Sequence, residues 1–89
     1  MIDIGSLAMQ ANLEDKVKFI LMSILQIEEN RVLIAKRGTT SSWDSMAWVN
    51  IISAIEDEFG IELNEEDYEL VSSFELICEL VKVKLKGGV

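Results

Sequence analysis

The stretch DSMAWVNIISAIEDEFGI, residues 44–61, decides how this chain folds. It opens with Asp44 and Ser45, two residue types that cap helices by accepting hydrogen bonds from free backbone N–H groups. Apolar residues then recur at spacings of three and four, which is the period of an amphipathic helix. Gly60 follows, and glycine is the residue type that most readily takes the left-handed conformation after a helix. The stretch therefore predicts a helix that begins at Asp44 or Ser45 and ends near Phe59.

The same signals predict three further helices. An amphipathic pattern over about residues 12–28 starts at Asn12, a favourable capping residue. An acidic turn after residue 60 suits the positive end of a helix dipole and predicts a short helix of about residues 65–70. Ser72 or Ser73 then caps a last amphipathic helix with lysines in its final turns. No segment has a convincing strand pattern.

These elements predict an all-α, four-helix bundle with a short third helix and a long loop between the first two helices. The loop covers residues 30–43, and such a long connection in a small domain often carries function. We expect residues 1–11 to be a loosely ordered extension, residues 12–86 to form the domain, and residues 87–89 to be a tail. The apolar positions expected to form the core, or to line a pocket in it, are Val49, Ile52, Ile55, Phe59, Leu63, Val71, Phe74 and Ile77.

Charge excludes several classes of function. The 89 residues carry 16 acids and 8 bases, a net charge of −8, and residues 38–81 hold eleven acids and no base. An acidic surface opposes binding to nucleic acid and to anionic membranes. No apolar run reaches the length of a membrane span, and the first residues lack the pattern of a signal peptide. We expect a cytoplasmic monomer that binds no nucleic acid and enters no membrane.

The residue inventory argues against catalysis by this chain alone. Histidine is absent and Cys78 is the one cysteine, so the commonest general base is missing and a zinc site lacks ligands. Cys78 lies on an apolar stripe and is expected to be a buried thiol rather than a redox or catalytic group. Residues 56–67 match the ligand positions of a calcium-binding EF-hand loop in neither register, so no metal site is expected.

The segment Asp44-Ser45-Met46 and the run EDEFGI at residues 56–61 resemble the acyl carrier protein family, whose motif is Asp-Ser-Leu at the start of the second helix. Met46 replaces the usual leucine. The match continues without gaps to about residue 81, whereas the first helix matches in pattern only. Simple helix capping is the alternative role for Asp44 and Ser45.

The resemblance implies that Ser45 carries a covalent 4′-phosphopantetheine arm, transferred from coenzyme A by a phosphopantetheinyl transferase. By analogy with the family, Asp44 would help to hold the magnesium-bound transferase complex. The thiol of the arm would then bear acyl intermediates as thioesters, so the protein itself would be a carrier and no enzyme. Partners would be acyl-transferring, ligating or synthase enzymes with basic docking patches.

In the family, one face of the second helix docks onto the basic patches of partner enzymes. The residues expected to contact partners here are Trp43, Met46, Trp48, Asn50, Glu56 and Asp57. The two tryptophans could instead pack against the long loop.

This face departs from the family pattern, because Ala47, Asn50 and Ser53 replace residues that are usually acidic or apolar. The departures favour a dedicated carrier in polyketide, nonribosomal peptide or sugar-acylation chemistry over the general carrier of fatty acid biosynthesis. An aminoacyl or peptidyl carrier is the nearest alternative. An unmodified helical interaction module is the alternative of another class.

Overall fold

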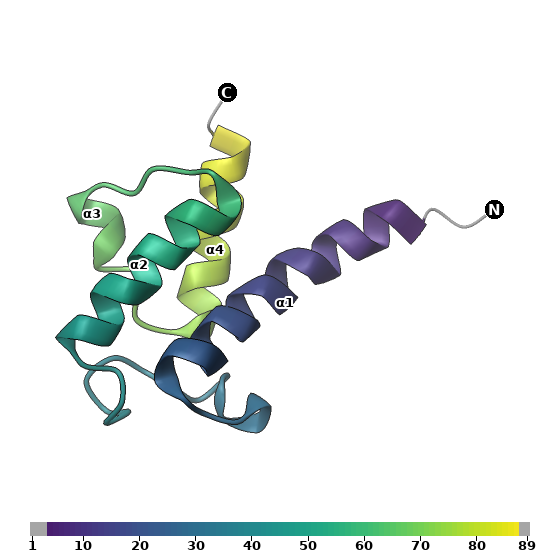
Figure 1. The fold of residues 1–89 in the computed structure, drawn as a ribbon. Coiled ribbons are helices and arrows are strands. Elements are labelled where there is room, and N and C mark those ends of the chain that lie inside the picture. Colours follow the sequence, from purple (N-terminus) through teal and green to yellow (C-terminus); the bar gives the residue numbers. More distant parts are fainter. Residues whose placement is uncertain (1–3, 88–89) are drawn as a thin grey trace.

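The computed structural model describes residues 4–87, with side chains described for residues 13–86. The elements in chain order are α1 (Ile4–Leu25), the 3-10 turn η1 (Glu29–Arg31), α2 (Ser45–Phe59), α3 (Glu65–Tyr68) and α4 (Phe74–Gly87). Helix α1 packs against both α2 and α4. Figure 1 shows the short α3 beside α2 and the first part of α1 extending beyond the other helices. The predicted all-α, four-helix architecture is confirmed, since the described residues form no strand beyond one isolated bridge.

Both ends of α2 lie where the sequence predicts them. The Asp44 carboxylate caps the helix, because its Oδ1 accepts a hydrogen bond from the Ala47 N–H at 2.9 Å. At the other end Gly60 has a φ of 64°, and the N–H groups of Gly60 and Ile61 both donate to the Glu56 carbonyl. These local contacts satisfy polar groups that a helix end otherwise leaves unpaired.

Helix α1 starts earlier and ends sooner than predicted. It begins at Ile4, so Asn12 lies within the helix and is not its N-cap. It ends at Leu25, and Gln26 turns the chain with a φ of 58°. Residues 1–3 and 88–89 lie outside the described residues. The division of the chain into an extension, a domain and a tail stays a prediction.

Helix α3 is short but firmly capped. Asn64 Oδ1 accepts from the Asp67 N–H, and Asp67 Oδ2 accepts from the Asn64 N–H, both at 3.0 Å. The same Asp67 carboxylate pairs with Lys84 Nζ of α4 at 2.6 Å. Burial raises the pKa of Asp67, but the Asn64 N–H and Lys84 outweigh it, so the pKa lies below its usual value. Asp67 therefore holds α3 against α4.

Of the two candidate caps for α4, the structure selects Ser73. Its Oγ accepts a hydrogen bond from the Leu76 N–H at 3.2 Å, and its carbonyl accepts from the Ile77 N–H. Ser73 also forms the isolated bridge with Lys36, which joins the long loop to the start of α4.

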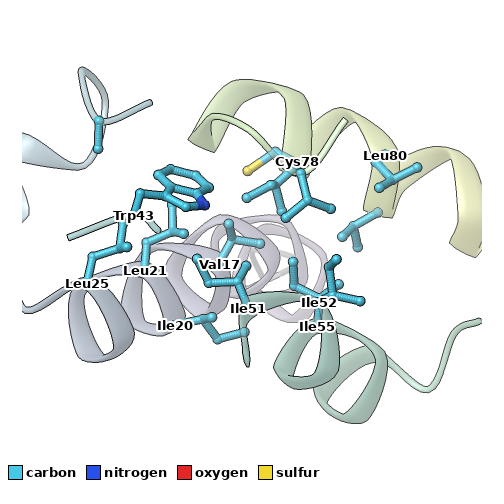
Figure 2. Packing of buried hydrophobic residues seen from close by; sticks show 14 of the residues in the cluster. Val17, Ile20, Leu21, Leu25, Trp43, Ile51, Ile52, Ile55, Cys78 and Leu80 are labelled. Carbon is cyan, nitrogen blue, oxygen red and sulfur yellow. The ribbon is translucent and has the colours of Figure 1, made fainter. Parts of the chain in front are cut away.

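The core confirms most of the predicted apolar positions. Figure 2 shows side chains of α1, α2 and α4 meeting there. Those predicted and found buried are Ile52, Ile55, Leu63, Val71 and Ile77, while Phe59 and Phe74 are half-buried. The prediction is wrong at Val49, which is 54% exposed. The buried stripe of α2 runs through Ala47, Ile51 and Ile55. Residue 49 is two positions from both 47 and 51, about 200° around the helix, and so faces outward.

Two matched substitutions test this division of the apolar residues. Val81 is fully buried in α4, whereas Val49 is exposed in α2. Changing valine to alanine removes the same two methyl groups in both and alters helix propensity equally. We expect Val81→Ala to lower the free energy of unfolding by about 2 kcal/mol more than Val49→Ala. Urea denaturation measures the difference, and equal losses would contradict the assigned core.

Candidate functional site

Ser45 stands exposed at the first position of α2. The first N–H groups of a helix have no carbonyl partner within it, and the aligned peptide dipoles make this end electropositive. Of these groups, the Ala47 N–H is taken by the Asp44 carboxylate. The regular helical hydrogen bonds begin with the Trp48 N–H, which donates to the Asp44 carbonyl at 2.9 Å. The Ser45 hydroxyl therefore lies on an open surface at the end of a helix that favours a negative group.

Trp43 sets where this exposed turn begins. Its indole is only 2% exposed and lies in the core close to Leu21 and Leu25 (Figure 2). Its backbone N–H donates to the Thr40 carbonyl at 2.9 Å, which closes the end of the long loop. The prediction that Trp43 contacts partners is therefore wrong, because an indole in the core offers no surface. The alternative, packing against the long loop, also falls short, because the indole belongs to the buried core formed mainly by the helices.

Trp48 occupies a different place, half-buried at the surface of α2. Its Nε1 donates to the Tyr68 carbonyl at 3.2 Å, and the two rings meet edge to face with centroids 6.2 Å apart. On the ring face, Arg37 Cζ lies 4.5 Å from the centroid. Trp48 thus joins α2 to the end of α3 and to the long loop.

Arg37 and Tyr68 are site residues that the sequence reasoning did not select. One signal was available for Arg37, which is the last base before the acidic stretch of residues 38–81. Nothing in the local pattern marks Tyr68, because its contact with Trp48 joins residues twenty positions apart.

The remaining predicted partner residues differ in their exposure to solvent. Met46, Asn50 and Asp57 are exposed along α2, as is Val49 between them. Met46 is 76% exposed directly beside Ser45. Glu56 is half-buried, and its Oε2 accepts a hydrogen bond from the Leu63 N–H at 2.9 Å. The carboxylate of Glu56 therefore fixes the link between α2 and α3, and a partner contact there stays a prediction.

A groove in the described part of the chain lies away from this face. It has a volume of about 940 Å³ and is lined by side chains of the α2–α3 link, α3 and α4, among them Ile61, Leu70, Leu76 and Val83. Neither Ser45 nor any residue of the predicted acyl pocket lines this groove. A pocket for cargo within the core stays a prediction.

Cys78 is buried, as the sequence predicts. Burial raises the pKa of its thiol to about 11, and Glu14 adds to this shift while Lys82 opposes it. The thiolate, which is the reactive form, is therefore scarce at neutral pH.

Among the described residues, the Asp and Glu side chains and Cys78 form no group of three or more that could hold a metal ion. None of the helices described here has the length and apolar character needed to cross a bilayer.

The described residues form a small all-α bundle with an exposed serine at the start of its second helix. No family model matches the chain. The chain is similar to the acyl carrier protein of Buchnera aphidicola subsp. Schizaphis graminum (strain Sg), with 36% identity over 76 residues, covering 84% of this chain and 96% of that protein. The chain therefore belongs to the acyl carrier protein family. Members of this family are acyl carriers rather than enzymes and bear covalent 4′-phosphopantetheine.

The environment of Cys78 gives a prediction for thiol chemistry. At a given neutral pH, a pKa of about 11 in place of 9.0 lowers the thiolate fraction about a hundredfold. We expect Cys78 in the folded protein to react with a maleimide far more slowly than the same residue in the urea-unfolded chain. Equal rates in the two states would show that the thiol is accessible.

Proposed function

We propose that Ser45 is the attachment site for 4′-phosphopantetheine and that the chain presents acyl intermediates, held as thioesters on the thiol of that arm, to partner enzymes. The observation that carries the proposal is the exposed Ser45 hydroxyl, directly after the capping residue Asp44 and at the electropositive end of a 15-residue helix. The family membership of the chain supports the same conclusion.

The residues around Ser45 fit a phosphodiester. The hydroxyl is open to a transferase, and a negative group there is favoured by the N-terminus of α2. Asp44 is exposed beside it and uses only Oδ1 to cap the helix, which supports a second role for this carboxylate in holding a transferase's Mg²⁺. The arm supplies the thiol that forms the thioester. The buried, poorly ionised Cys78 does not compete with that thiol for cargo.

The exposed face of α2 supports docking in two parts. Within α2 itself, the exposed residues nearest the serine are the uncharged Met46, Val49 and Asn50. Exposed acids follow about two turns after Asn50, at Asp57 and Glu58, and again in the first turn of α3. A basic partner surface would be steered by the distant charges and would make its close contacts with the uncharged part.

This distribution supports a dedicated carrier of a polyketide, nonribosomal peptide or sugar-acylation pathway over a general fatty-acid carrier. The partners we propose are a phosphopantetheinyl transferase and the acyl-transferring, ligating or synthase enzymes of that pathway. An aminoacyl or peptidyl cargo would use the same serine. The net charge of −8 favours an acyl cargo, since aminoacyl and peptidyl carriers are usually less acidic. The single buried thiol agrees with a cytoplasmic location, where disulfides are rare.

Loading from coenzyme A tests the attachment site. After incubation with coenzyme A, Mg²⁺ and a broad-specificity phosphopantetheinyl transferase, we expect the intact mass to rise by one phosphopantetheinyl group. The Ser45→Ala variant should show no gain, whereas Ser23→Ala, at an exposed serine of α1, should load normally. A gain that survives Ser45→Ala would refute this site, and the absence of any gain would favour the unmodified interaction module.

The rate of loading tests the different roles of the uncharged and the acidic parts of the exposed face of α2. We expect Met46→Ala to lower the transferase kcat/KM about fivefold, equivalent to about 1 kcal/mol, because it removes a close apolar contact. Asp57→Asn should have a smaller effect that disappears at high salt. The control is Leu85→Ala, at an exposed residue of α4, which should change neither the transferase kcat/KM nor its dependence on salt. A greater loss of kcat/KM for Asp57→Asn than for Met46→Ala would contradict the proposal that the close contacts lie on the uncharged part of α2.

A further inference from the structure

A single cation lies over the aromatic face next to the proposed attachment site. The guanidinium carbon of Arg37 is 4.5 Å from the ring centroid of Trp48, which is a cation–π distance. Among the described residues, the ion pairs involve Lys16, Lys18, Lys82 and Lys84, and none involves Arg37. The charge of Arg37 therefore rests on an indole and not on a carboxylate, although the chain has twice as many acids as bases.

The backbone that carries Arg37 is fixed at several points. Its N–H donates to the Ser72 carbonyl at 3.0 Å, and the neighbouring Lys36 forms the bridge with Ser73. The chain then turns at Gly38, whose φ of 101° is one that side-chain-bearing residues rarely adopt. Because the Lys36 carbonyl also accepts the Thr40 N–H, the loop is closed around Arg37 and presents its side chain from a fixed position.

The indole under the guanidinium is fixed as well. Its Nε1–H is bonded to the Tyr68 carbonyl, and the Tyr68 ring contacts it edge to face. Arg37 thus lies on a platform whose orientation is set by α2 and by the end of α3. A cation held in this way loses little further freedom when it binds a ligand.

The platform is next to Ser45 in the helix. Trp48 follows Ser45 by three positions, which places their Cβ atoms about 5–6 Å apart on one face. Side chains in a helix point back toward its N-terminus, so the indole of Trp48 leans toward the turn that holds Ser45. A group attached to Ser45 would therefore have this indole, and the guanidinium stacked on it, as its neighbours along the helix.

We propose that Arg37, stacked on Trp48, binds the phosphodiester that joins the prosthetic arm to Ser45. This inference rests on the proposed function. A guanidinium is suited to the task because its planar N–H groups match phosphate oxygens and can still stack on an aromatic ring. It also offsets the repulsion between the phosphodiester and the Asp44 carboxylate, which the cap holds next to Ser45. Arg37 would thereby orient the first bonds of the arm toward α3.

Phosphorus NMR of the loaded protein tests this role without measuring activity. A phosphodiester bound to Arg37 reorients with the whole protein, so its 31P line should be broad relative to that of the same loaded chain unfolded in urea. Arg37→Gln should narrow the line toward the unfolded value, and Trp48→Leu should narrow it too because the platform is lost. Lys36→Gln is the matched control, since it removes an equal charge one residue away from an exposed side chain and should leave the line broad.

The outcomes separate this inference from the proposed function. A mass gain with a 31P line that is unchanged in Arg37→Gln overturns the role of Arg37 and leaves the attachment site intact. Equal narrowing in Arg37→Gln and Lys36→Gln also overturns it, because general charge would then explain the effect. If no mass gain occurs at Ser45, the proposed function and this inference both fail.

Discussion

Burial of the Trp43 indole directly before the cap of α2 is the constraint on which the rest of the structure depends. A large aromatic side chain in the core ties the end of the long loop to α1, as its position beside Leu21 and Leu25 shows. Its Nε1 has no hydrogen-bond partner among the described residues, which costs about 1–3 kcal/mol, so the packing around the ring must outweigh that loss. With residue 43 inside, the capping turn at residues 44–46 must emerge at the surface.

The two tryptophans near Ser45 stabilise the site in different ways. Trp43 is buried in the core, directly before the start of α2. Trp48 lies at the surface, where it contacts Tyr68 at the end of α3 and Arg37 of the loop. Helix α3 has only four residues and is itself held by Asp67, which joins its own cap to Lys84 of α4. The site is therefore built by short elements that are fixed by specific polar contacts.

The sequence predicts the features that depend on local interactions. Both ends of α2 depend on residues within one turn, so Asp44 and Gly60 could be assigned from the sequence alone. Burial of Trp43, the hydrogen bond between Glu56 and Leu63 and the stacking of Arg37 depend on contacts made by the folded chain, and local patterns do not contain them. The exposure of Val49 is also hard to predict, since an apolar residue on a mostly apolar helix does not reveal which way it faces.

The central claim is that the turn at Ser45, presented by the buried Trp43, holds the prosthetic arm. Comparing backbone amide NMR spectra of the unloaded and loaded protein tests it most directly. We expect shift changes centred on residues 44–48 and extending to Arg37 and Tyr68, with core residues such as Val17 and Val81 unmoved. Changes centred on the groove between α3 and α4, with residues 44–48 unaffected, would contradict it.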